Sequence, residues 1–121
     1  MLHQFGDEQL VSLEDYEKYL RRIIKRIPVL FPYAKICFAL STQVVEEYFH
    51  TPKYHRYNAE IEAYNAAALK IMQEENIPVD DLYTVSAQMP REWHTLDGTH
   101  FTREGYEALG KAVAEFLEGQ L

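Results

Sequence analysis

The first periodic segment of the chain starts at Ser12 and predicts an amphipathic helix. Its apolar side chains recur at helical spacing and comprise Tyr16, Leu20, Ile23, Ile24 and Ile27. Ser12 is suited to cap this helix, with Asp15 as its capping-box partner. We expect Pro28 to break or kink the last turn and Phe31-Pro32 to end the helix.

Two shorter segments predict strands. The segment Lys35–Leu40 is apolar after its first residue, which predicts a strand buried on both faces, as in parallel sheets. The polar run Ser41-Thr42-Gln43 follows it directly. The segment Pro78–Tyr83 predicts a second short strand that leads into a turn or a helix.

Helical periodicity returns twice more along the chain. The range 57–75 predicts a helix whose buried side comprises Ile61, Tyr64, Ala68, Ile71 and Met72. The last helix is expected to start after Thr102, a credible N-cap, and its apolar positions are Tyr106, Leu109, Val113, Phe116 and Leu117. Gly105 and Gly110 weaken this helix slightly, and we expect them to allow close packing against a neighbouring element.

The order of these elements is helix, strand, helix, strand, helix. This order predicts an α/β fold, a doubly wound three-layer α/β/α sandwich with a parallel sheet. We expect residues 1–121 to form a single domain. Because two strands alone would leave both sheet edges open and the apolar faces poorly covered, we expect the sheet to be incomplete in this chain. Further strands would come either from before residue 1 or from another subunit.

Composition narrows the class of partner. A net charge of -7 and a pI of about 5.2, with no basic cluster, argue against nucleic acid as a partner. The longest apolar run, Ile36–Leu40, is too short to span a membrane, and no signal-peptide pattern is recognisable. The single cysteine, Cys37, lies in that run and is expected to be a core residue. We therefore expect a cytoplasmic protein.

The strongest chemical signal is the pair Asp97 and His100, just before the last predicted helix. A histidine that acts as a base needs one ring nitrogen facing the substrate and the other held by an acceptor, and a carboxylate fixes its tautomer. Gly98 gives the intervening turn the backbone freedom to bring the two side chains together. The alternative is a simple Asp-Gly turn with no chemical role.

The segment Asp97–Tyr106 resembles the last conserved motif of the SGNH (GDSL-like) hydrolases, an Asp-x-x-His followed by a helix. The resemblance extends over the whole chain as the C-terminal half of such an enzyme. Residues 12–16 resemble the helix before the family's fourth strand, and 34–42 resemble that strand with its polar exit. Residues 58–76 resemble the next helix, and 77–83 the last strand, of a flavodoxin-like fold.

The resemblance implies a role for each member of the pair. His100 would be the general base and Asp97 its orienting partner in a serine ester hydrolase of the lipase or acylesterase kind, which acts on a small ester without a cofactor. The family's nucleophile lies in a Gly-Asp-Ser motif, but Gly6-Asp7 is followed here by Glu8. The chain would thus carry the Asp–His pair without the serine. The alternative is an inactive remnant or interaction module that dimerises to complete its sheet.

Other hydroxyl groups in the chain are candidates to replace the missing serine. Ser41 and Thr42 are the best internal replacements for the serine, because strand ends face the site in such sheets, although a structural or substrate-lining role is favoured. Ser86 has no partner recognisable in the sequence.

The spacing His94-x-x-Asp97-x-x-His100 must also be considered as a metal site. The segment is loop-like and no fourth ligand is evident, so no metal is expected, and His94 is placed beside the site entrance or at the surface. The stretch 48–57 is rich in aromatic and imidazole groups, for which a core or interface role is favoured over a substrate flap. Its members are Tyr48, Phe49, His50, Tyr54, His55 and Tyr57.

Overall fold

A computed structural model of the protein describes residues 9–49 and 55–121. Its first element, helix α1 (Leu13–Leu30), begins at Ser12, whose Oγ accepts the backbone N–H of Asp15 at 3.1 Å. The helix passes through Pro28 and ends at Leu30, with Phe31 as its C-cap. The predicted cap and the predicted end of this helix are therefore both confirmed.

The middle of the chain forms a short parallel sheet. Strand β1 (Phe38–Ala39) pairs with β2 (Val79–Asp80), and Phe38 lies opposite Val79. Between the strands run the 3₁₀ turn η1 (Glu46–Tyr48) and helix α2 (Asn58–Glu74). After α2, Asn76 adopts a left-handed conformation with φ of 56°, a common way to end a helix.

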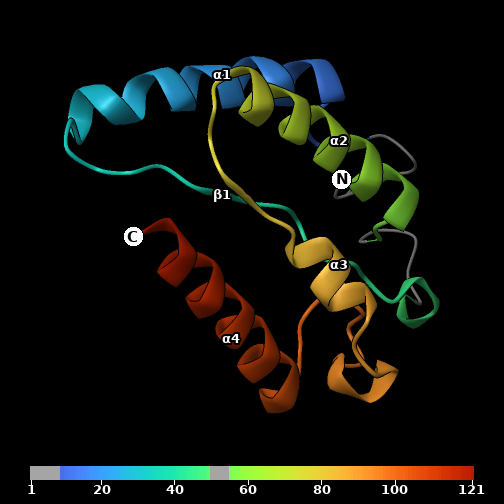
Figure 1. Ribbon diagram of the computed structural model, residues 1–121. Coiled ribbons are helices and arrows are strands. Elements are labelled where there is room, and N and C mark those ends of the chain that lie inside the picture. Colours follow the sequence, from blue (N-terminus) through green and yellow to red (C-terminus); the bar gives the residue numbers. More distant parts are fainter. Residues whose placement is uncertain (1–8, 50–54) are drawn as a thin grey trace.

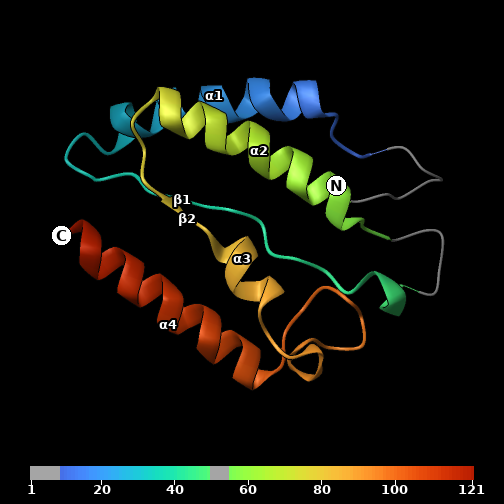
Figure 2. The same cartoon turned by 45° about the vertical axis from the view of Figure 1, so that its right-hand side comes forward.

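Three elements follow β2 and complete the order. These are helix α3 (Leu82–Ala87), the 3₁₀ turn η2 (Arg91–Trp93) and helix α4 (Arg103–Gln120). Figures 1 and 2 show α1 and α2 on one side of the strands and α4 on the other. The predicted α/β fold with a parallel middle layer and helices on both sides is confirmed.

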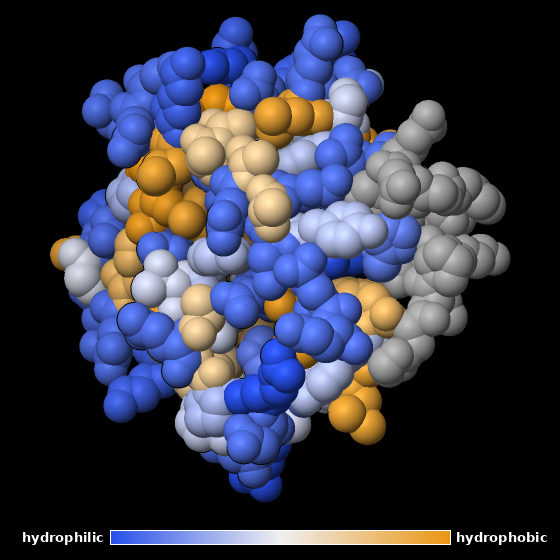
Figure 3. All heavy atoms as spheres, turned by 90° about the vertical axis from the view of Figure 1, so that its right-hand side faces the viewer, coloured by the Kyte–Doolittle hydropathy of each residue, from blue (hydrophilic) through white to orange (hydrophobic). Residues whose placement is uncertain are grey.

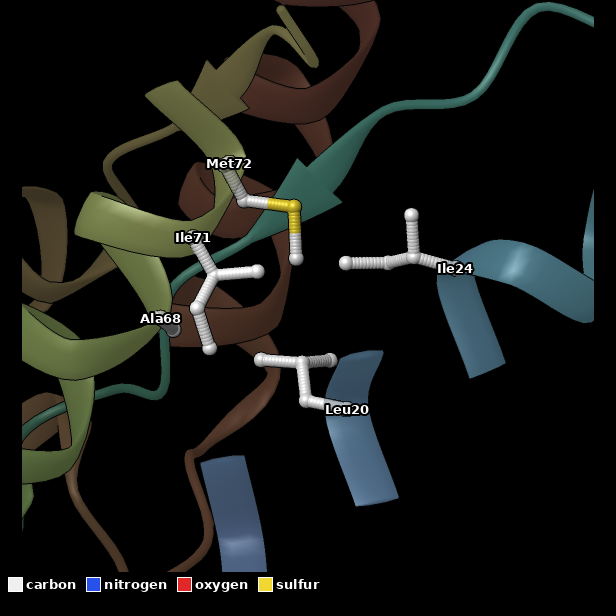
Figure 4. Packing of buried hydrophobic residues seen from close by; sticks show 5 residues of the cluster. All are labelled: Leu20, Ile24, Ala68, Ile71 and Met72. Atoms are coloured by element: carbon white, nitrogen blue, oxygen red, sulfur yellow. The ribbon is translucent and has the colours of Figure 1, made fainter. Parts of the chain in front are cut away.

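The main core lies between α1, α2 and the sheet. Leu20 and Ile24 from α1 meet a row of α2 side chains, as Figure 4 shows. That row consists of Ala68, Ile71 and Met72, and Tyr16, Phe38, Ile77 and Val79 pack around it. All five α2 positions predicted to face inward are buried. The helical periodicity therefore located this core correctly.

The opposite side of the sheet is covered more thinly. Helix α4 packs mainly against α3, and its apolar positions are only half-buried or exposed, with Tyr106 at 50% and Leu117 at 48% exposure. A groove remains between α4 and β1, lined by Phe38 and Ala39 of the strand and by Cys37 just before it.

The prediction that β1 is buried on both faces is therefore wrong. Phe38 is half-buried and Ala39 exposed, because the two-stranded sheet has no third strand beside β1 among the described residues. Cys37 is likewise half-buried rather than a core residue. In the described ranges, no helix combines the length and apolar character that crossing a membrane requires.

Candidate active site

Asp97 and His100 lie in a short loop that backbone hydrogen bonds close just before α4. The N–H of Thr95 donates to the carbonyl of His100 at 2.9 Å, and the N–H of Gly98 donates to the carbonyl of Thr95 at 3.0 Å. Below the loop, an antiparallel bridge joins His94 to Phe101. The loop is thus a tight turn on a small two-stranded base, which limits where its side chains can point.

The Asp97 carboxylate is fully engaged by hydrogen bonds within this loop. Its Oδ1 accepts the Thr95 hydroxyl at 2.7 Å and the N–H groups of Thr99 and His100 at 2.9 Å each. Its Oδ2 lies 2.5 Å from Nδ1 of His100. The structure therefore brings together the two side chains singled out in the sequence. Both remain accessible, since the side chains of His100 and Asp97 are 66% and 51% exposed.

The electrostatics of the loop favour an ionised Asp97. Burial by itself would raise the pKa of this carboxyl, but the hydrogen bonds from His100, Thr95 and Thr99 outweigh it and hold the pKa well below its usual range. A carboxylate on Nδ1 favours the tautomer that carries its proton there. The other ring nitrogen, Nε2, has no hydrogen-bond partner in the described part of the chain and can accept a proton from an incoming group.

Gly98 attaches this loop to the segment that follows β1. Its φ is +78°, and a Cβ at this position would lie 2.8 Å from the carbonyl oxygen of Val45 and 3.1 Å from the Phe49 ring. The carbonyl of Gly98 accepts the N–H of Val45 at 2.9 Å. Glycine is needed here both for the backbone conformation and for the close approach.

Side chains from α2 and α3 hold the segment after β1 in place. The buried Asn65 accepts the N–H of Ser41 and donates to its carbonyl, both at 2.9 Å. Asn58 makes the same pair of bonds, also 2.9 Å each, with Val44. The hydroxyl of Ser86 accepts the N–H of Gln43 at 2.8 Å and donates to the carbonyl of Tyr83 at 2.8 Å. Ser86 therefore has partners that its sequence context did not indicate.

These clamping residues were missed because their partners are distant in sequence. A signal for Asn65 was nevertheless present, since it falls on the buried side of the helical pattern beside Tyr64 and Ala68. A polar residue in an apolar stripe needs a buried partner. Neither hydroxyl proposed as a replacement nucleophile gains support, because no hydrogen bond joins Ser41 or Thr42 to His100 in the described ranges.

A polar cavity of about 210 Å³ lies between η1, α3 and η2. Its lining includes Gln43, Glu46, Glu47, Asn58, Arg91 and His94. Figure 3 shows one end of the molecule from outside: hydrophilic side chains cover most of it, with hydrophobic groups in separate patches. The cavity is thus lined by charged and amide groups. It lies beside the segment around Val45, and this segment contacts the Asp97 loop.

His94 was expected beside the site entrance or at the surface, and a position at the surface is wrong. It is 6% exposed and its ring stacks on Phe101 with the centroids 4.8 Å apart. Burial lowers its pKa, a hydrogen bond with the Ser86 backbone raises it, and the charge of Arg91 lowers it further, with a net lowering. In residues 9–49 and 55–121, no three His, Cys, Asp or Glu side chains gather closely enough to hold a metal ion. The His-x-x-Asp-x-x-His spacing is therefore not a ligand cluster in this structure.

The aromatic stretch contributes contacts around the loop. Phe49 lies against Gly98, Tyr48 is within 5.8 Å of the Arg91 guanidinium, and His55 is buried with its ring edge-on to Tyr57. His50 and Tyr54 lie outside the described residues. Phe49 and His55 thus take part in packing, whereas Tyr57 is 38% exposed, and the choice between a core or interface role and a substrate flap stays a prediction.

Several solved structures have a fold similar to that of this chain. The lipase/acylhydrolase from Enterococcus faecalis superposes with a TM-score of 0.76 and 23% identity, over 96% of this chain and 56% of that one. The esterase domain of the zebrafish ZfL2-1 retrotransposon ORF1 protein superposes with a TM-score of 0.73 and 19% identity, over 90% of this chain and 65% of that one. A member of the lipolytic protein G-D-S-L family from Veillonella parvula superposes with a TM-score of 0.56 and 18% identity, over 82% of this chain and 52% of that one.

The chain thus spans between 52% and 65% of the length of these structures. The likeness shows a common fold, that of SGNH-type hydrolases with a flavodoxin-like sheet. A comparison with curated protein sequences gave no significant match. The sequence profile of the GDSL-like lipase/acylhydrolase family, however, matches residues 4–108. The chain belongs to the GDSL-like lipase/acylhydrolase family.

Proposed function

We propose that this chain supplies the Asp97–His100 pair of a serine ester hydrolase whose nucleophile lies outside these 121 residues. The observation that carries the proposal is the 2.5 Å contact between Asp97 Oδ2 and His100 Nδ1, which leaves Nε2 accessible. Membership of the family and the lack of a Gly-Asp-Ser sequence in the chain support it. The substrate class is a small carboxylic ester, and neither a metal nor a cofactor takes part. Location in the cytoplasm and the absence of a nucleic-acid partner stay predictions.

The reaction follows from the geometry of the pair. Nε2 of His100 takes the proton from the serine hydroxyl as the oxygen attacks the ester carbonyl, and the same nitrogen then returns the proton to the departing alcohol. Water repeats the two steps on the acyl ester and releases the carboxylic acid. Asp97 stays ionised throughout, because its hydrogen bonds lower its pKa. It stabilises the imidazolium that exists between the two proton transfers.

Hydrolysis of p-nitrophenyl acetate and butyrate tests this function. The 121-residue chain should not hydrolyse these esters above the rate of its own His100→Ala variant. The chain extended by its in-frame upstream coding sequence should hydrolyse them, and His100→Ala should lower kcat of that enzyme by about 10³-fold or more with little change in KM. Leu96→Ala is the matched control, because Leu96 lies in the same loop, is 80% exposed and makes none of these bonds.

Two outcomes would contradict the proposal. Hydrolysis by the 121-residue chain that His100→Ala abolishes would place a complete site within it, with Ser41 or Thr42 to be tested next as the nucleophile. A folded, extended protein that hydrolyses neither ester would favour the inactive remnant.

A second candidate function is an interaction module that dimerises to complete its sheet. It is favoured by the exposed apolar positions on α4, Tyr106 and Leu117, and by the outer edge of β1, which has no partner strand among the described residues. Light scattering during size-exclusion chromatography tests it. A dimer that Leu117→Glu dissociates would support the module, whereas a stable monomer would exclude it.

A further inference from the structure

Thr95 makes use of all its polar groups within the Asp97 loop. Its N–H donates to the carbonyl of His100 at 2.9 Å, and its carbonyl accepts the N–H of Gly98 at 3.0 Å. Its hydroxyl donates to Asp97 Oδ1 at 2.7 Å. The direction of this last bond is certain, because an ionised carboxylate can only accept. Thr95 therefore closes the loop through its backbone and also contacts the carboxylate through its side chain.

The donors are divided unequally between the two oxygens of Asp97. Among the described residues, Oδ1 accepts three of them, and the hydroxyl of Thr95 is the only side-chain donor, since the other two are the N–H groups of Thr99 and His100. In the same ranges, Oδ2 has Nδ1 of His100 as its single partner. Because both oxygens move together when the carboxylate rotates, the bonds to Oδ1 also hold Oδ2 in place against Nδ1.

Such restraint matters because the pair is exposed. The Asp97 and His100 side chains are 51% and 66% exposed, and water competes for an exposed carboxylate and weakens its ion pairs. Packing therefore cannot fix the orientation of Asp97 as it would in a buried triad. The fixed donors on Oδ1 do so instead, and among them only the Thr95 hydroxyl can be removed by substitution without touching the turn's backbone.

We infer that Thr95 is a positioning residue, whose hydroxyl orients the Asp97 carboxylate so that Oδ2 faces Nδ1 and Nε2 of His100 stays unprotonated. The inference rests on the proposed function only for its consequence in catalysis. Its effect on the structure is on the tautomer of His100, that is, on which ring nitrogen carries the proton. This tautomer can be measured in the 121-residue chain without any esterase activity.

Nitrogen-15 NMR of the His100 ring at alkaline pH, where imidazole is neutral, tests the inference. Wild type and Thr95→Ser, which keeps the hydroxyl, should show the tautomer with the proton on Nδ1. Thr95→Val, which keeps the shape of the side chain and removes the hydroxyl, should show an increased share of the Nε2-protonated form. Carbon-13 titration of Asp97 should show a higher carboxyl pKa in Thr95→Val than in Thr95→Ser, because one stabilising hydrogen bond is lost.

Two results would overturn the inference: identical tautomer shares in wild type and Thr95→Val, or an equal change in Thr95→Ser. If Thr95→Val does not fold, as judged by circular dichroism, Thr95→Ala is compared with Thr95→Ser, since these two differ only by the hydroxyl. In the active extended enzyme, Thr95→Val should lower kcat by about tenfold with KM unchanged, the loss expected for one hydrogen bond to a charged group. An inactive enzyme with the tautomer change intact would contradict the proposed function and leave the role of Thr95 standing.

Discussion

At the scale of single residues, the Asp97 carboxylate combines high exposure with a full set of donors. A surface ion pair between an aspartate and a histidine would by itself contribute little to stability. Here the hydroxyl of Thr95 and two N–H groups of the turn also donate to the carboxylate. The ionised Asp97 thus stabilises the turn in addition to its role in the proposed chemistry. Its ionisation should therefore change the free energy of unfolding.

The first prediction concerns the pH dependence of this stability. The pKa of Asp97 is lowered from its ordinary value of 3.8 in the folded state. Its contribution to stability is therefore complete above that value and lost as the pH falls through the lower, folded-state pKa. Urea unfolding should show wild type more stable than Asp97→Asn near neutral pH, and this margin should shrink in acid below 3.8. A margin that is the same at neutral and acid pH would refute the assignment.

The second prediction concerns the backbone of the same turn. Gly98→Ala should lower the free energy of unfolding by about 1–3 kcal/mol, because alanine is strained at positive φ and its Cβ would lie against a backbone oxygen. That oxygen is the carbonyl of Val45, 2.8 Å from the added carbon. Leu96→Ala, in the same loop and 80% exposed, should change stability by less than about 0.5 kcal/mol. Equal effects in urea unfolding of the two variants would show that the turn tolerates a side chain here.

The sequence indicated these residues to different degrees. Asp97, Gly98 and His100 are neighbours, so their spacing alone predicted a shared turn, and the structure has it. The bonds from Asn65 to Ser41 and from Ser86 to Gln43 span 24 and 43 positions. No local pattern reveals which distant backbone group a polar side chain will meet, and these contacts could be found only from the fold.

At the scale of elements, the helices were more predictable than the strands. A helix satisfies its backbone within itself, so the Ser12 cap and the inward side of α2 could be read locally. The apolar face of α1 was predicted less well, since Leu20 and Ile24 are buried but Ile23 is 53% exposed. A strand forms only where a partner lies beside it. The apolar run before Ser41 is therefore a strand only at Phe38–Ala39, where β2 pairs with it, although its composition is that of a longer, fully buried strand.

The third prediction compares two glycines of α4 that the sequence treats alike. A Cβ on Gly105 would lie 2.7 Å from the Trp93 carbonyl oxygen and 2.8 Å from Phe101 Cβ, whereas a Cβ on Gly110 would meet nothing within 4 Å. The expectation of close packing is thus right for Gly105 and wrong for Gly110. Gly110→Ala should stabilise the protein by about 0.5–1 kcal/mol through helix propensity. Gly105→Ala should destabilise it by about 1–3 kcal/mol through overpacking. Thermal unfolding should give shifts of opposite sign, and shifts of the same sign would contradict the packing of α4 against η2.

At the scale of the whole molecule, the two sides of the sheet are unequal. The side facing α1 and α2 holds the buried cluster around Ile71, whereas the side facing α4 keeps an open groove beside Cys37 and Ala39. Solved relatives with the same fold are longer, since this chain spans 52–65% of them. A three-layer fold would place further strands at the open edges of this sheet and helices over its faces. Having only two predicted strands could indicate that the sheet was incomplete, but not at which edge further strands lie.

This inequality predicts where the protein's stability resides. Ile71→Ala should cost about 2–5 kcal/mol, because the side chain is 1% exposed and its loss leaves a cavity in the main hydrophobic cluster. Leu117→Ala should cost less than about 1 kcal/mol, since half of that side chain already faces water. Urea unfolding at several protein concentrations measures both. If another copy covers α4, the cost of Leu117→Ala will rise with concentration, because dimer formation then contributes to stability by mass action. A small cost at every concentration would leave the face of α4 uncovered in solution and would count against the dimerising module.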